Sequence, residues 1–296
     1  MNYNSILIPI LSLIFFACQN RNQESQSKAN VDHIDIETGD EKPNETISQS
    51  QKWDKTFNWS RIPLLKEQLK LDLERDPNEI DKTLIRFLDE YEAMVREFNN
   101  ILFDLDNYDS LNTIAHAPDY TIDESAREFK KQAEKNGLRI ASSEGMIYLT
   151  MNTGYLNSNV YNQLDSVSRE FLSLYIEEID NVCCEDAAII ISDRELVERA
   201  FNWGNLLERS YNLEYRRLAE SRFNYYIDLV FIGIDNTPSF DWQTGDFNKG
   251  IFESMNEIIV KYPNSIASKQ FKGFSEVLVS ENFKLTAKVR AYLDSR

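Results

Sequence analysis

Apolar residues recur along residues 80–105 at alternating spacings of four and three, which is the pattern of one buried helix face. The positions are Ile80, Leu84, Phe87, Tyr91, Met94, Phe98, Ile101 and Leu105. Leu88, Val95 and Leu102 form a second row that widens the stripe. A broad stripe rich in aromatic residues favours a globular helical bundle over the narrow seam of a coiled coil. We therefore expect a long amphipathic helix with a broad buried face.

Helix start signals and further apolar stripes indicate that most of the remaining chain is also helical. Capping motifs at residues 76–79, 121–124 and 192–195 predict three helix starts, with Asp76, Thr121 and Ser192 as the expected capping residues. Further helices are expected near residues 165–175, 213–232, 249–261, 265–279 and 283–293. Two short apolar runs, 138–141 and 146–150, flank Ser142-Ser143-Glu144-Gly145 and predict a β-hairpin. The expected fold class is mainly α: an irregular helical bundle with one small β-hairpin.

The chain begins with an apolar run, from Ile6 to Ala17, that is followed directly by Cys18. About a dozen residues are too few for a helix that spans a bilayer, which needs roughly 20. The run suits a secretory signal that is cut after a small residue. Ala17-Cys18 resembles the lipobox of bacterial lipoproteins, in which cleavage precedes a cysteine that is then lipidated. A cleaved signal with an incidental cysteine and a buried strand are the alternatives.

The lipobox resemblance implies a division of the chain into three parts. Residues 1–17 would be the lipoprotein signal peptide, and residues 18–55 the lipidated Cys18 with its tether. The tether has few large apolar residues and cannot bury enough surface to offset its ordering entropy, so we expect it to be disordered. Residues 56–296 would form the helical domain, with a sub-boundary near residues 137–155 at the hairpin.

The same resemblance implies a place in the cell envelope, with the membrane as a partner through the lipid anchor. The residues that follow Cys18, Gln19 to Gln23, lack the acidic pair that sends some Bacteroidota lipoproteins to the cell surface. We therefore expect an outer-membrane anchor with the protein facing the periplasm.

Acidic residues outnumber basic ones and narrow the class of partner. The formal net charge is −17, from 49 Asp and Glu against 32 Lys and Arg. Such a surface repels nucleic-acid phosphates, so no nucleic-acid partner is expected. Cations and basic partners remain candidates, although solubility alone would also account for the charge.

Two segments near the C-terminus, Asn205–Asn212 and Asn256–Pro263, align with each other. Each closes a helix with a tyrosine, makes a short turn and starts another helix. The second continues as KYPNSIASKQFKGF and is similar to the junction of tetratricopeptide-like (TPR-like) repeats, without their regular period of about 34 residues. This resemblance implies TPR-like helical pairs. More broadly, residues 138–296 resemble secreted or lipid-anchored bacterial proteins of unknown function, through EDAAIIISDRELVERAFNW, GIDNTPSFD and KYPNS.

Besides Cys18, the chain contains Cys183 and Cys184, which are adjacent and lie in an acidic stretch. A strained vicinal disulfide is one interpretation for an oxidising compartment. A pair of small buried side chains at a helix end is the simpler one. A metal site is least favoured, because zinc sites space their cysteines by two to four residues, and no metal ligand is assigned.

The segment DNTPSFDWQTGD sets aromatic residues among acids and is a candidate binding loop. Its members are Asp235, Asn236, Phe240, Asp241 and Trp242. Exposed aromatic residues beside carboxylates could bind a sugar or a peptide. More often, such residues pin a loop to its domain.

The chain has no G-x-S-x-G, phosphate loop, dinucleotide fingerprint or H-E-x-x-H motif. No catalytic residue and no cofactor is assigned, and an enzyme is the less favoured class. The favoured function is binding or scaffolding in the envelope, through recognition of a protein or peptide on the TPR-like groove. The alternatives are a carboxylate-dependent envelope hydrolase and a weak divalent-cation binder.

Overall fold

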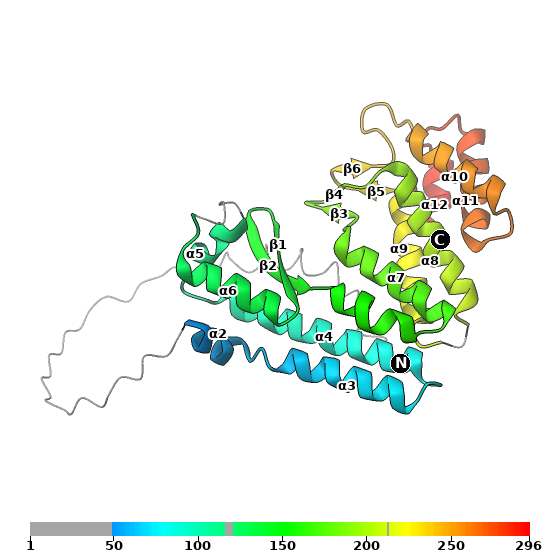
Figure 1. Cartoon of the computed structure of the whole chain (residues 1–296). Helices are drawn as coiled ribbons and strands as arrows, with labels where there is room; N and C mark the ends of the chain where they lie inside the picture. The colour runs from blue at the N-terminus through cyan, green and yellow to red at the C-terminus, as the bar shows by residue number, and fades with distance from the viewer. Residues whose placement is uncertain (1–48, 116–120, 212) are drawn as a thin grey trace, which may run out of the picture.

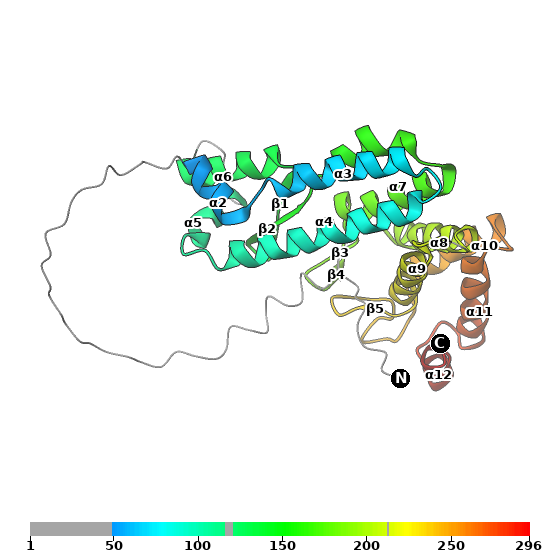
Figure 2. The ribbon, with the colours of Figure 1, turned by 90° about the horizontal axis from the view of Figure 1, so that it is seen from below.

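The computed structural model describes residues 49–115, 121–211 and 213–296, so Cys18 and most of the predicted tether lie outside it. Two groups of elements flank α7 (Ser166–Asp180), as Figures 1 and 2 show. The first group comprises α2 (Gln49–Phe57), α3 (Arg61–Arg75), α4 (Ile80–Phe103), α5 (Tyr108–Asn112), α6 (Glu124–Lys135), β1 (Leu138–Ser143) and β2 (Met146–Met151). The second comprises α8 (Asp193–Arg209), α9 (Arg216–Phe231), α10 (Lys249–Lys261), α11 (Ile266–Ser280) and α12 (Ala287–Asp294). Within the described ranges, no helix is both long and apolar enough to cross a membrane.

The mainly α fold with a small hairpin is confirmed, and two further strand pairs accompany it. These pairs are β3 (Cys184–Glu185) with β4 (Ala188–Ile189), and β5 (Gly233–Ile234) with β6 (Thr237–Pro238). Strands of two residues are too short to show an alternating pattern. In the turn between β3 and β4, Ala187 has a φ of 52°, a conformation in which alanine is uncommon. The glycine or asparagine that usually marks such a hairpin turn in a sequence is therefore missing at this position.

The folded part begins earlier than the expected residue 56. Helix α2 starts at Gln49, and its Trp53 is fully buried. Phe57 stacks on Trp59 with their ring centroids 4.5 Å apart, and Trp53 meets Phe129 of α6 edge-on at 5.2 Å. Residues 49–55 therefore belong to the helical domain, because aromatic burial outweighs the polar composition around Trp53.

The hairpin pairs in a single antiparallel register, with Ser143 opposite Met146 at the turn. Glu144 and Gly145 both have positive φ, 51° and 78°, as a two-residue hairpin turn requires. The outer edge of β2 is covered by Asn99 of α4, which is fully buried. Its Nδ2 donates to the Leu149 carbonyl at 2.9 Å, and its Oδ1 accepts from the Leu149 N–H at 2.6 Å. Asn99 thus takes the place of a neighbouring strand.

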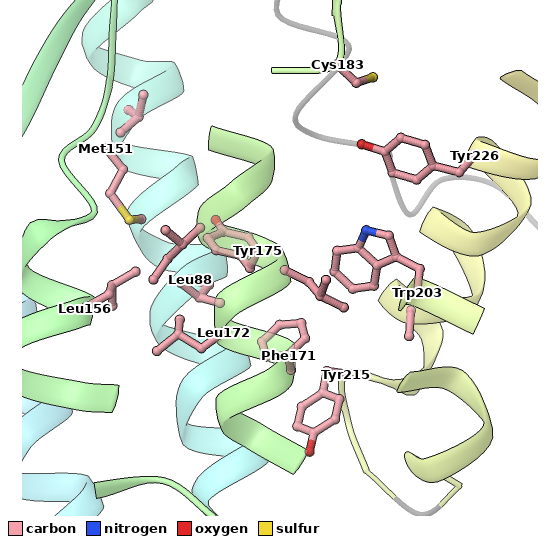
Figure 3. Packing of buried hydrophobic residues seen from close by; sticks show 14 of the residues in the cluster. Leu88, Met151, Leu156, Phe171, Leu172, Tyr175, Cys183, Trp203, Tyr215 and Tyr226 are labelled. Carbon is pink, nitrogen blue, oxygen red and sulfur yellow. The ribbon is translucent and has the colours of Figure 1, made fainter. Parts of the chain in front are cut away.

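Helix α7 presents apolar side chains to both groups (Figure 3). Figure 3 shows Leu172 and Tyr175 turned toward Leu88 of α4, and Phe171 turned toward the second group. Phe171 stacks on Tyr215 with ring centroids 4.5 Å apart. One continuous core therefore runs through α7 from one group to the other.

The helical pairs expected at the C-terminus are present, with α8 packed on α9 and α10 packed on α11. Tyr262, which follows α10, stacks on Phe201 of α8 at 4.4 Å. Gly204 lies where α8 meets α9 and α11. A Cβ atom there would come within 2.9 Å of Phe223 and 3.0 Å of Ile266, so glycine permits this close approach.

The role of Asn99 can be tested by replacing it with alanine. Asn99→Ala leaves the buried N–H and C=O of Leu149 without partners, so we expect a loss of about 2–4 kcal/mol in the free energy of unfolding. Asn100→Ala is the control, because Asn100 is exposed on the same helix. Urea unfolding measures both variants, and equal losses would contradict the role given to Asn99.

Candidate functional site

A cavity of about 290 Å³ opens between the hairpin, α4, α7 and β3. We call it the hairpin cavity. It is lined by Tyr91, Glu92, Val95 and Arg96 of α4, by Arg139, 141–143 and 148–151 of the hairpin, by Tyr175 and 178–180 of α7, and by Val182, Cys184 and Glu185. These segments are far apart in the sequence, and the position of α7 brings them together.

The outer face of the hairpin forms one wall of the cavity. In the observed register, Ala141 lies opposite Tyr148, and Arg139 lies opposite Thr150. Side chains alternate along a strand, so these four share one face, while Ile147 points to the opposite, buried face. The alternation that anchors the hairpin to the core therefore also supplies a partly polar surface to the cavity.

Glu92 brings a mostly buried carboxylate to the cavity wall. Its Oε1 accepts a 2.6 Å hydrogen bond from the Tyr175 hydroxyl, and its Oε2 lies 3.6 Å from Nη1 of Arg96. Burial raises the pKa of Glu92 above the 4.5 of an ordinary glutamate, although Tyr175 and Arg96 favour the ionised form. Burial also raises the pKa of Tyr175, so its hydroxyl keeps the proton that it donates.

Glu178 joins the cavity wall to the second group of helices. It is only 6% exposed, and its Oε1 accepts hydrogen bonds from Trp203 Nε1 at 3.0 Å and from the Tyr226 hydroxyl at 2.7 Å. Arg199, which is 2% exposed, donates to the same tyrosine oxygen at 3.2 Å and to the Asn181 carbonyl at 2.7 Å. This buried network links α7, α8 and α9.

The other polar groups of the cavity differ in how far they are engaged. Asp180 accepts from Arg139 Nη1 at 3.2 Å and from Thr153 Oγ1 at 2.6 Å, so both of its oxygens are engaged. Ser143 Oγ is buried and has no hydrogen-bond partner among the described residues. A buried hydroxyl without a hydrogen-bond partner is costly to the folded state.

The two adjacent cysteines lie at the edge of the hairpin cavity. Cys183 precedes β3 and is buried, while Cys184 begins β3, is half-buried and lines the cavity. Both are free thiols in this structure. No group of three or more His, Cys, Asp or Glu that could hold a metal ion occurs in the described ranges.

The candidate binding loop divides into two parts. Asp235 and Asn236 form the turn between β5 and β6. The backbone N–H of Asn236 donates a 2.8 Å hydrogen bond to the carbonyl of Ala187, in the turn between β3 and β4. Phe240 is buried against Phe247, so it pins the loop.

The rest of this loop forms a separate turn. The carboxylate of Asp241 accepts from the N–H groups of Gln243 and Thr244 at 2.9 Å and 2.6 Å. These hydrogen bonds lower the pKa of Asp241. Trp242 is 77% exposed. The structure thus places Asp235 and Asn236 beside the β3–β4 hairpin, which begins at Cys184, and leaves Trp242 at the surface.

Two other hollows are weaker candidates. The one between α8 and α10, where the sequence predicted a recognition groove, encloses about 40 Å³. Another, of about 280 Å³ between α3 and α4, is lined mostly by polar and charged residues, and its buried Asp72 is already paired with Arg75 and Arg86. The hairpin cavity combines volume with apolar walls and is the best candidate.

Comparisons with known proteins supply no relative for this chain. No protein-family model, curated protein or solved structure matches it. Any role for the cavity therefore rests on its own geometry and chemistry.

Glu92 and Asn99 were not predicted as functional or structural residues, although the spacing of apolar residues along the long helix contains a signal for both. The second row of the long helix is Leu88, Val95 and Leu102, and helical spacing fills its gaps with Glu92 and Asn99. A polar residue inside an apolar row needs a buried partner. The sequence does not show that the partners are Tyr175 and the backbone of Leu149.

The raised pKa of Glu92 makes a testable contribution to stability. The folded protein holds this proton to higher pH than the unfolded chain does, so the contribution of Glu92 falls as the pH rises from about 4.5 through the raised pKa. Glu92→Gln keeps an acceptor for Tyr175 and removes the titration. Its stability relative to wild type should therefore increase across that pH range in urea unfolding.

Glu92→Ala separates this titration from the loss of the hydrogen bond. It leaves the buried Tyr175 hydroxyl without an acceptor and should cost about 1–3 kcal/mol. A difference between Glu92→Gln and wild type that does not change from pH 4 to pH 8 would contradict the assignment.

Proposed function

We propose that the protein is a lipid-anchored binding module of the cell envelope, held through Cys18 in the outer membrane and facing the periplasm. The hairpin cavity then receives a segment of another envelope protein or a peptide. The observation that carries this proposal is the cavity itself, because apolar walls with a few polar groups are usual for ligand sites.

The size and lining of the cavity support a small ligand segment. Its volume of about 290 Å³ lies at the lower limit of ligand pockets, roughly 300–1,000 Å³. Val95, Ala141 and Ile179 supply apolar surface, while Arg139 and Glu92 supply polar groups. One side chain of a partner, or a short peptide, fits such a site better than a large ligand.

A carboxylate-dependent hydrolase is the second candidate, because Glu92 has the raised pKa that a general acid needs. Hydrolysis of a glycosidic bond needs a second carboxylate with room for substrate or water. Glu178 and Asp180 already accept hydrogen bonds from protein donors. Binding is therefore the better supported function.

The proposed lipid anchor can be tested by removing Cys18 and measuring the cell fraction in which the protein is found. Cys18→Ser removes the thiol that would be acylated, so the full chain should move from the membrane fraction to the soluble fraction. Cys184→Ser is a matched control that makes the same change elsewhere and should leave the protein in the membrane. Immunoblots of the fractions measure both, and retention of Cys18→Ser would rule out the anchor.

The proposed partner can be captured from the cavity. A photo-crosslinking amino acid in place of Tyr148 should give a defined adduct in intact envelopes, because Tyr148 lines the cavity. The same amino acid in place of Tyr211, which is 76% exposed, should not give that adduct.

Formation of this adduct should also require that the hairpin cavity is not filled by another side chain. Ala141→Trp places a bulky side chain beside residue 148 and should abolish the adduct while leaving the melting temperature unchanged. An adduct that persists in Ala141→Trp would count against binding in the cavity.

A further inference from the structure

Cys183 and Cys184 place two thiols in contact at the edge of the hairpin cavity. Their sulfur atoms lie 2.8 Å apart. Cys184 lines the cavity, whereas Cys183 is only 5% exposed. A molecule that enters the cavity therefore meets Cys184 first, with Cys183 directly behind it.

The hydroxyl of Tyr225 on α9 contacts both sulfurs. It donates to Cys184 Sγ at 3.4 Å and lies 3.7 Å from Cys183 Sγ. Burial raises the pKa of Tyr225, so the hydroxyl keeps its proton. A hydrogen-bond donor beside a sulfur stabilises the thiolate form, which is the nucleophile in thiol chemistry.

The surroundings make the two thiols unequal. The hydrogen bond from Cys183 lowers the pKa of Cys184 below the 9.0 of an ordinary thiol, and Tyr225 and the Arg199 guanidinium add to this. Burial and the Glu178 carboxylate oppose it. The pKa of Cys183 is raised by its hydrogen bond to Cys184 and by burial. Cys184 therefore loses its proton at a lower pH than Cys183, which stays protonated beside it.

A disulfide between adjacent residues is strained. Their Cα atoms are about 3.8 Å apart across a trans peptide, whereas ordinary disulfides join Cα atoms about 4.4–6.8 Å apart. Strain makes a disulfide easier to reduce. An adjacent pair therefore suits reversible exchange better than a permanent crosslink.

We propose that Cys184 and Cys183 form a redox-active dithiol that exchanges with a disulfide-bearing ligand in the hairpin cavity. The Cys184 thiolate attacks one sulfur of the ligand, the ligand's S–S bond breaks, and one half leaves as a thiolate. Cys183 then loses its proton to water and attacks the Cys184 sulfur, which expels the second half as a thiolate. Two electrons pass from the pair to the ligand, which becomes two thiols while the pair becomes a strained disulfide. The exchange therefore proceeds toward ligands whose own disulfide is still more easily reduced, such as an aromatic disulfide with a good leaving thiolate.

This exchange goes beyond the proposed binding role and needs neither the anchor nor an envelope partner. The test uses the reduced full chain with Cys18→Ser, so that only this pair reacts. The probe is the aromatic disulfide dithiobis(nitrobenzoate), whose thiolate absorbs visible light. We expect two thiolates released per protein and a product without adduct in its mass spectrum, and dithiothreitol should restore the reduced protein.

Single variants in the same background separate the two roles. Cys183→Ser should release one thiolate and keep a stable adduct on Cys184, because the second attack is lost. Cys184→Ser should react at least about tenfold more slowly, because Cys183 is buried. A stable adduct on the protein that retains both cysteines, or equal rates for the two variants, would overturn the proposal.

Tyr225 is a positioning residue in this proposal, and its effect should be visible in the pH dependence. Tyr225→Phe removes the donor to Cys184 Sγ, so the pH–rate profile of the first release should shift to higher pH. Tyr211→Phe, at an exposed tyrosine, should leave the profile unchanged. A profile that Tyr225→Phe does not move would overturn the role given to its hydroxyl.

Discussion

The position of α7 depends on one buried carboxylate, that of Glu178. Desolvating an ionised carboxylate costs several kcal/mol unless hydrogen bonds replace the lost water. Trp203 of α8 and Tyr226 of α9 provide those bonds, and Arg199 connects Tyr226 to the Asn181 carbonyl at the end of α7. A rotation of α7 would unpair these groups together. One turn earlier, Tyr175 binds Glu92 on α4, so polar contacts fix both flanks of the helix.

Much of the fold follows from local patterns. The row of apolar residues predicted the long helix that became α4, and the two apolar runs predicted β1 and β2. Helix starts were less predictable. Ser192 caps α8 as expected, but Asp123 rather than Thr121 caps α6. Asp76 instead binds the N–H of Asn78 in a turn, and α4 begins only at Ile80. Capping residues can close turns as well as helices, so sequence alone does not choose between them.

Individual residues at and near the hairpin cavity were predicted from the sequence, but the cavity itself was not. Cys183, Cys184, Asp235 and Asn236 were recognised as two separate candidates, and the structure places their hairpins side by side. The contact between Glu92 and Tyr175 spans 83 positions of the chain. No local pattern encodes such a pairing, because it arises from the packing of α7 between two groups of helices. A cavity made of distant segments is a property of that packing.

The buried network and the thiol pair share one turn of α9. Tyr226 donates to Glu178, while its neighbour Tyr225 contacts both sulfurs. A well-packed apolar contact in place of Glu178 could be equally stable, so stability alone does not explain a buried carboxylate here. The carboxylate does fix the rotation of α9 about its axis, and this rotation directs the Tyr225 hydroxyl toward the thiols. The same hydrogen bonds that position the cavity wall therefore also hold the dithiol in its unequal surroundings.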